Sequence, residues 1–357
     1  FYILAIFRSL QGLGAAFIMP SALSIVTKTF KKNQERNRAI AIFSSFAAIG
    51  NGSGLSIGGI ITTLLSWHWV FLINVPILFI NLVLAYKYLP KDNIISKTEK
   101  KDTISGIFLV VGLLSITYGT HELVNFNKHS LVVLISLIFG LLMIIAVYYR
   151  LKFLSQPLIN LNLFRYKSLI TSNVTFFSLG AFYIGFLFLI SLILQNDLNY
   201  SAASAGILLS PFSILSAFVA KFILPVISKK ISSLQMSIVG WLFMLIGSAI
   251  LSLSIYFNNS LILILIGSAC ISGVGITFCF TGLSVMGILD IETENYGIAS
   301  SLGTTSYFLG AGIGLSLITL LTQLFTFSNL SLFILISYAL IALIILFFYN
   351  SYYRKSK

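Results

Sequence analysis

Charged residues are scarce in this sequence: they make up 9% of its 357 residues, whereas hydrophobic residues make up 58%. A soluble domain carries about 25% charged residues, so the composition excludes a soluble globular fold. Eleven apolar stretches instead reach the roughly 20 residues that a helix needs to cross the hydrocarbon core of a bilayer. The sequence therefore predicts an all-α, polytopic membrane protein with eleven transmembrane helices.

Cysteine and histidine are also rare. Cys270 and Cys279 are the only cysteines, and their spacing on one helix places them on opposite faces, so they cannot form a disulfide and have a packing role. The histidines, His68, His121 and His129, fall in expected outer loops without metal-ligand spacing. We expect no metal and no cofactor. Without paired His, Asp or Glu inside a span, an intramembrane enzyme is not expected either.

Polar connections divide the chain into three parts. The spans are expected at 1–27, 39–65, 69–88, 103–120, 130–149, 168–195, 203–225, 234–257, 260–286, 297–325 and 330–350. Two longer connections, 88–102 and 150–167, separate groups of three, two and six spans. The expected units are therefore 1–98, 99–150 and 151–357.

The basic residues predict the orientation of the chain. Apart from Arg8, Lys128 and Lys221, every Lys and Arg falls in alternate connections or at the C-terminus, and connections rich in Lys and Arg face the cytoplasm. We expect a cytoplasmic C-terminus in the plasma (inner) membrane, with the lipid bilayer as a partner. The net charge of +13 is not accompanied by interleaved aromatic and basic residues, so we expect no nucleic acid partner.

Arg8 lies inside the first span, where the sequence offers no acidic residue to pair with it. A charge inside a membrane helix costs at least about 3 kcal/mol and normally faces a polar interior or water. Arg8 either reaches the outer headgroups or faces a packed interior. The neighbouring Gln11, Gly12 and Gly14 favour the second interpretation.

Glycines recur every four residues in the second span, at Gly50, Gly54 and Gly58, and Gly59 extends the stripe. Small residues at this spacing let two helices approach closely. Packing alone explains the stripe; the functional alternative is a smooth surface along which two bundles slide. In either case we expect the backbone of Gly58 to lie close to another helix.

Several segments resemble one family of membrane transporters. The residues Leu4, Arg8, Gln11, Gly12, Gly14, Ala15 and Ala16 resemble the fourth-helix motif of drug:proton antiporters of the major facilitator superfamily. The stripe from Gly50 to Gly59 resembles the antiporter motif of their fifth helix. SWHWVFLINVPI, QPLINLNLF, LQND…AGILLSP and YGIASSLGTTSYFLGAGIG are similar to later segments of the fourteen-span, EmrB/QacA-like branch.

The resemblance implies a major facilitator fold, of which this chain holds helices four to fourteen and lacks the first three. Units 1–98 and 151–357 would then be the second half of the amino-terminal bundle and the complete carboxy-terminal bundle, and 99–150 the two inserted linker helices. The chain departs from the family at Leu55, where a proline usually follows the glycine. Because proline would kink the helix, the stripe is expected to be straighter here.

The same resemblance implies proton-coupled efflux of amphipathic drugs by alternating access, with small-molecule substrates and protons as partners. Arg8 would serve proton coupling. Every acidic residue falls in a loop or at a span end, so the proton-carrying carboxylate is expected in the missing helices. Alternatives are export of one metabolite or siderophore, or a non-functional truncated transporter. An accessory periplasmic adaptor is a further partner to consider.

Residues expected to line a substrate cavity combine polar groups with aromatic rings that suit cationic ligands. They are Gln11, Asn51, Phe177, Tyr183, Tyr307 and Phe308. The alternative for each aromatic ring is contact with lipid or with a neighbouring helix. Lys221, inside the seventh span, either extends to the inner headgroups or faces the cavity.

Overall fold

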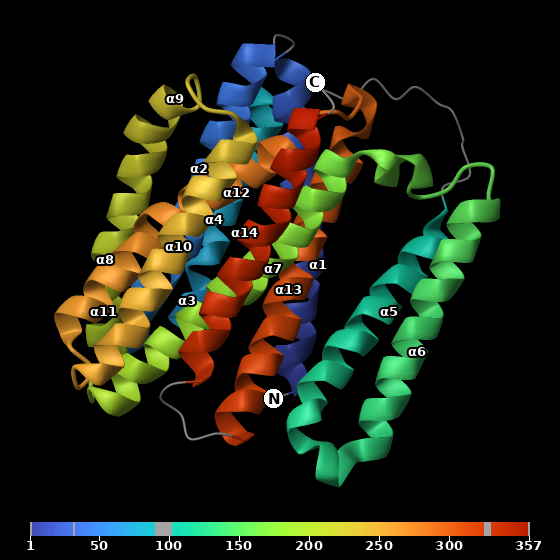
Figure 1. Cartoon of the computed structure of the whole chain (residues 1–357). Helices are drawn as coiled ribbons and strands as arrows, with labels where there is room; N and C mark the ends of the chain where they lie inside the picture. Colours follow the sequence, from blue (N-terminus) through green and yellow to red (C-terminus); the bar gives the residue numbers. More distant parts are fainter. Residues whose placement is uncertain (1, 31–32, 90–101, 325–329, 356–357) are drawn as a thin grey trace.

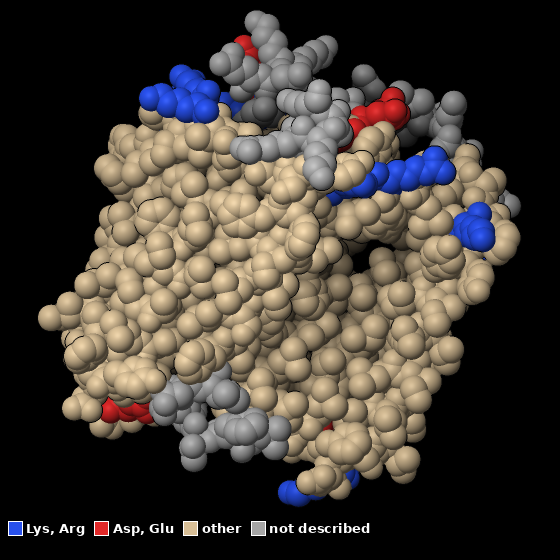
Figure 2. Space-filling model, viewed as in Figure 1, with Lys and Arg blue, Asp and Glu red and all other residues tan. Residues whose placement is uncertain are grey.

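The computed structural model describes residues 2–30, 33–89, 102–324 and 330–355. These residues form helices and connections without a strand. The predicted boundary between residues 98 and 99 lies outside the described part of the chain. In Figure 1 the helices run roughly parallel, and we call the end that carries the C-terminus the basic end, because Lys and Arg gather there on the face shown in Figure 2.

The first part of the chain forms α1 (Tyr2–Thr29), α2 (Asn33–Leu64), α3 (Trp69–Leu72) and α4 (Asn74–Tyr88). No residue of α4 is buried, and its apolar side chains face outward. α2 continues without a break through the glycine stripe, as the absence of proline at Leu55 predicts. It packs against α8 along much of its length, whereas α1 lies beside α13 (Figure 1).

The predicted pair of spans between residues 103 and 149 forms an antiparallel hairpin of α5 (Thr103–Glu122), η1 (Leu123–Asn125) and α6 (Phe126–Phe153). The buried positions within it recur every seven residues: Ser105, Gly112 and Gly119 on α5, and Val133, Gly140 and Val147 on α6. A repeat of seven keeps one stripe of each helix facing its partner. The hairpin stands at one side of the bundle in Figure 1.

The last part of the chain forms a six-rod bundle. Its elements are η2 (Leu161–Arg165), α7 (Lys167–Leu192), η3 (Ile193–Asp197), α8 (Ala202–Phe218), η4 (Val219–Ile223), α9 (Leu224–Ile227), α10 (Ser233–Tyr256), α11 (Leu261–Ser268), η5 (Ala269–Gly275), α12 (Ile276–Met286), η6 (Thr293–Asn295), α13 (Tyr296–Leu324) and α14 (Leu330–Lys355). The sequence did not predict the π-helical segments η3, η4 and η5: η4 and η5 interrupt two of the rods, and η3 ends the rod that begins with α7. Such widened turns are frequent at functional sites.

The described residues contain eight stretches that are long and apolar enough to cross a membrane. One of them, Thr103–Phe153, comprises both helices of the hairpin, and α1 and α2 precede the others. With these counted, the helices follow the order of the eleven predicted spans. The prediction of an all-α polytopic membrane fold is confirmed.

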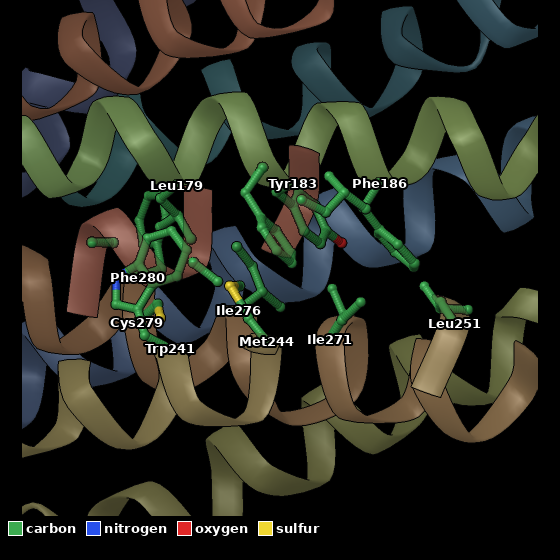
Figure 3. Packing of buried hydrophobic residues seen from close by; sticks show 14 of the residues in the cluster. Leu179, Tyr183, Phe186, Trp241, Met244, Leu251, Ile271, Ile276, Cys279 and Phe280 are labelled. Atoms are coloured by element: carbon green, nitrogen blue, oxygen red, sulfur yellow. The ribbon is translucent and has the colours of Figure 1, made fainter. Parts of the chain in front are cut away.

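The core of the six-rod bundle lies where α7 faces α10 and α12. In Figure 3, Leu179, Tyr183 and Phe186 of α7 point toward Trp241 and Met244 of α10. All of these side chains are almost completely buried. The other side of α7 crosses α13 with the two backbones in contact, because a Cβ at Gly180 would collide with the carbonyl of Tyr307.

We predict that Gly180→Ala destabilises the bundle by about 1–3 kcal/mol, the usual effect of forcing an extra methyl group into a packed site. The helices must separate to make room for the methyl group. The thermal midpoint in detergent measures the loss. Gly297→Ala on α13 is the matched control, because a Cβ there meets no atom within 4 Å. Equal midpoints for the two variants would contradict the close crossing.

Candidate functional site

Arg8 lies on α1 among exposed neighbours, distant from the basic end. Its Nη1 donates a hydrogen bond to Oε1 of Gln11 (2.9 Å), and its guanidinium lies over the ring of Phe71, 5.5 Å from the centroid. Among the residues that the structure describes, Arg8 forms no ion pair with a carboxylate. Its positive charge is therefore satisfied only by an amide oxygen and an aromatic face, which leaves it able to attract a further anion.

The contact between α2 and α8, which we call the seam, is closest at one glycine. A Cβ at Gly59 would lie 2.7 Å from the carbonyl oxygen of Ala202 and 3.3 Å from Cα of Gly206. By contrast, a Cβ at Gly50, Gly54 or Gly58 would meet no atom within 4 Å. The prediction that Gly58 approaches another helix closely is therefore wrong. The two neighbouring positions differ by about 100° around the helix axis, and Gly59 is the one that faces α8.

A small cavity of about 250 Å³ opens beside this contact, and Gly54 and Gly58 line it. Polar groups from both sides of the seam reach it: Thr62 on α2, Ser191 on α7 and Gln195 in η3. The side chain of Gln195 donates a hydrogen bond to Oγ of Ser191 (2.6 Å). The sequence analysis did not single out Ser191 or Gln195, although a glutamine at the end of an apolar span was a usable signal.

At the basic end α2 is held by apolar packing against other parts of the six-rod bundle. Ile40, near the start of α2, is fully buried in a cluster with Leu163, Val285 and Tyr296 from the six-rod bundle. The guanidinium of Arg36 lies 5.2 Å from the centre of the Tyr296 ring. The first helices and the six-rod bundle therefore meet at both ends of α2, through a backbone contact at one end and a buried side chain at the other.

The aromatic residues predicted to line a cavity do not gather around one space. Tyr183 is buried in the core, where its hydroxyl and that of Ser272 share a hydrogen bond (3.1 Å). Tyr307 is 3% exposed and packs edge-on against Phe280. Phe177 lies at the crossing of α7 with α13, since a Cβ at Gly310 would collide with its carbonyl.

Phe308 does face a space, a side cavity of about 590 Å³ between α1, α5 and α13. Small residues of α1, including Gly12 and Ala15, form one wall, and the hydroxyl-bearing Thr304 and Thr305 of α13 form another. The side chain of Asn51 lies outside the described part of the chain. Gln11 is exposed near Arg8, so the structure brings together Arg8 with Gln11, but not these two with the aromatic residues.

Lys221 lies in the π-helical segment η4 and is exposed, with its ammonium 5.3 Å from the centre of the Phe222 ring. Its neighbours Phe218 and Phe222 are also more than half exposed. These apolar surroundings agree with the first interpretation of Lys221, in which its side chain extends along the surface to the inner headgroups. Cys270 and Cys279 are both free, as expected.

Comparison with known proteins places these features in context. The sequence profile of the Major Facilitator Superfamily matches residues 1–315. Multidrug resistance protein Stp of Mycobacterium tuberculosis is 24% identical over 87% of this chain and 57% of its own length. Multidrug resistance protein 3 of Bacillus subtilis is 28% identical over 90% of this chain and 62% of its own length. Cephamycin export protein CmcT of Amycolatopsis lactamdurans is 29% identical, over 88% and 65%. The chain thus spans about three-fifths of the length of these relatives.

We predict that Gly59→Ala slows any transport by this protein about tenfold, because the methyl group would force α2 away from the backbone of Ala202 and change the packing of α2 on α8. Gly58→Ala is the matched control on the adjacent residue and is expected to transport normally. Initial rates in vesicles, normalised to folded protein, provide the measurement. A loss of folded yield in Gly59→Ala would assign this glycine to packing alone, and a slow Gly58→Ala would contradict the geometry of the seam.

Proposed function

This chain belongs to the major facilitator superfamily, and on that basis we propose that it exports amphipathic small molecules by alternating access. The family match confirms the resemblance drawn from the sequence, the multi-pass membrane fold and the expectation that the chain is not an enzyme. Two of the relatives are named for multidrug resistance and a third for export of an antibiotic. For this chain such cargo is our proposal.

The seam is the observation that carries the proposal. Transporters of this kind move substrate by rocking one bundle against another around a site near the bilayer midplane. In the division that we propose, units 1–98 and 151–357 are the two moving parts, and 99–150 is an insertion between them. α2 and α8 belong to different units, and they touch backbone to backbone at Gly59 and Gly206.

In this proposal, alternating access is a movement of α2 against the six-rod bundle. At Gly59 and Gly206 the two backbones meet without a side chain from either residue between them, and we propose that α2 tilts about this contact. At the basic end, opening requires Ile40 to leave its apolar cluster. Exposing a buried isoleucine costs about 1.5–3 kcal/mol, which is small enough to be offset by the binding of a substrate.

We propose proton coupling through Arg8, in the plasma (inner) membrane and with a cytoplasmic C-terminus. The guanidinium has an amide oxygen and an aromatic ring as partners but no carboxylate among the described residues. A carboxylate that approaches it would be held in its charged form, and substrate binding would then release or take up a proton. Protons and a small molecule are the proposed partners; an accessory periplasmic adaptor stays a prediction.

A dye-efflux assay tests the function. Everted vesicles that contain the protein should pump a cationic dye such as ethidium inward when ATP or respiration acidifies their lumen, and a protonophore should abolish the pumping. Vesicles prepared from the same cells without the protein serve as the control for leakage of the dye. Dye transport that persists without a pH gradient would overturn proton coupling, and no transport of any amphipathic dye would overturn multidrug export.

Export of a single metabolite is the second candidate, and the similarity to a cephamycin exporter favours it. The same vesicles distinguish the two. A multidrug exporter transports several chemically unrelated dyes and antibiotics, whereas a dedicated exporter transports one compound class. Competition by a panel of unlabelled antibiotics against ethidium gives the answer directly.

For Arg8 we predict that Arg8→Ala abolishes proton-driven efflux while membrane insertion is retained. Arg8→Lys should restore it only in part, because an ammonium group lacks the planar fork of donors that the guanidinium presents to a carboxylate. Gln11→Ala, which removes the neighbouring partner but leaves the charge, is the matched control and should lose less activity. Wild-type efflux by Arg8→Ala under an imposed pH gradient would assign Arg8 to contact with headgroups.

A further inference from the structure

A buried carboxylate holds together three segments at the basic end of the hairpin. Oδ1 of Asp102 accepts hydrogen bonds from the backbone N–H of Ser105 (3.1 Å) and from Nη2 of Arg150 (3.1 Å). Its Oδ2 accepts from the backbone N–H of Leu158 (3.4 Å), and Nε of Arg150 donates to Oγ of Ser105 (3.2 Å). The start of α5, the end of α6 and the connection to η2 therefore meet at one side chain.

The Asp102 side chain is only 1% exposed, whereas that of Arg150 is 33% exposed. Burial by itself raises the pKa of the Asp102 carboxyl, but the hydrogen bonds from Ser105, Arg150 and Leu158 lower it below its ordinary value. The carboxylate is therefore ionised at neutral pH. A buried charge of this kind is strongly destabilising once its partner is removed, so the pair resists separation.

Apart from this point, the hairpin has few attachments to the bundle. Among the described elements, α6 packs substantially on α5 and η1 only, whereas α5 and η1 also meet α13. The contact with α13 is close at Gly312, where a Cβ would lie 3.0 Å from Cγ2 of Thr117. Both helices carry exposed apolar side chains, as at Ile104 and Ile135.

The hairpin also forms one wall of the side cavity. Leu113, Leu114 and Thr117 of α5 face the cavity, with α1 and α13 on its other sides. Figure 2 shows a hollow between the hairpin and the rest of the molecule. Because α5 forms this wall of the cavity, any displacement of the hairpin away from α13 changes access to the cavity.

From these contacts we infer that the hairpin is a side lid. The Asp102 carboxylate, which binds both Arg150 of α6 and the backbone N–H of Leu158 in the connection to η2, is the clamp that ties the base of the hairpin to this connection and so keeps α5 on α13. The two helices move as one unit, because Gly112 and Gly140 lock them together: a Cβ at Gly140 would lie 2.8 Å from the carbonyl oxygen of Gly112. The clamp fixes the angle at which this unit leaves the connection to η2. The inference does not rest on the proposed cargo or on proton coupling.

Two cysteine pairs test the clamp in a background where Cys270 and Cys279 are replaced by Ala. The docking pair, Thr117→Cys with Gly312→Cys, reports contact between the hairpin and α13. The internal pair, Gly112→Cys with Met143→Cys, reports contact within the hairpin, because a Cβ at Gly112 would lie 3.0 Å from Cβ of Met143. Rates of disulfide formation under a mild oxidant in native membranes are compared with and without Asp102→Asn.

Asn is a good residue for the start of a helix, so Asp102→Asn keeps the hydrogen bond from the N–H of Ser105. It replaces the other oxygen by an amide nitrogen, so it removes both the charge that pairs with Arg150 and the acceptor for the N–H of Leu158. We expect the docking pair to cross-link about tenfold more slowly in this variant, with the internal pair unchanged. Glu122→Gln is the matched control: this carboxylate at the other end of α5 pairs with His129 (3.0 Å), away from the clamp. It should leave both rates unchanged.

The outcomes separate the alternatives. An unchanged docking rate in Asp102→Asn would overturn the clamp, and an equal loss at both pairs would assign Asp102 to the stability of the hairpin itself. A second readout is the reaction of Thr304→Cys, inside the cavity, with a membrane-soluble maleimide. A lid predicts that Asp102→Asn speeds this labelling, and an unchanged labelling rate would overturn the lid.

Discussion

In hydrocarbon, two helices gain little from burying apolar side chains against each other, because lipid tails offer the same contacts. What remains is close packing, and in this protein it is supplied by glycine. Gly180 brings α7 onto α13, Gly140 brings α6 onto α5, and Gly59 brings α2 onto α8. In each case an added Cβ would meet the backbone of the neighbouring helix. The arrangement of the rods follows from where these positions face.

The number of glycines at which two helix backbones touch differs between interfaces, and this number affects how easily the two helices can move against each other. α7 and α13 touch at Gly180, Gly310 and Gly314, so their crossing is fixed at several successive turns. Along the seam, only Gly59 among the glycines of α2 that were predicted to form it touches α8. The crossing of α7 with α13 thus has close backbone contacts at several turns. The interface of α2 with α8 extends along much of α2, but only one of these glycines makes a close backbone contact there. We expect movement to be easier at the interface of α2, as the proposed alternating access requires.

The spans were predictable because hydropathy and loop charge act along the chain, before any tertiary contact exists. The rotation of each helix about its axis was not predictable, since it depends on the partner; this is why Gly58 was chosen where Gly59 makes the contact. Composition also could not distinguish Tyr183, which is buried in the core, from Phe308, which faces a cavity.

Polar contacts between residues far apart in the sequence also could not be predicted. Asp102 was correctly placed at the end of a span, but its partner Arg150 lies at the far end of the next helix, and nothing local signals the pairing. Gln195 could be noticed as a glutamine at the end of an apolar span, but the cavity that it lines forms only where α2 meets α7, η3 and α8. The predicted division into units at 98/99 and 150/151 has no direct structural test and stays a prediction.

The seven-residue spacing of Ser105, Gly112 and Gly119 against Val133, Gly140 and Val147 has a consequence for biosynthesis. All of these buried contacts join residues less than 50 positions apart in the sequence. The two helices can therefore pair with each other as soon as both have left the translocon, while α7 is still being made. A ribosome that has just released α6 would already have a finished helical pair in the bilayer, ready to receive the rods that follow.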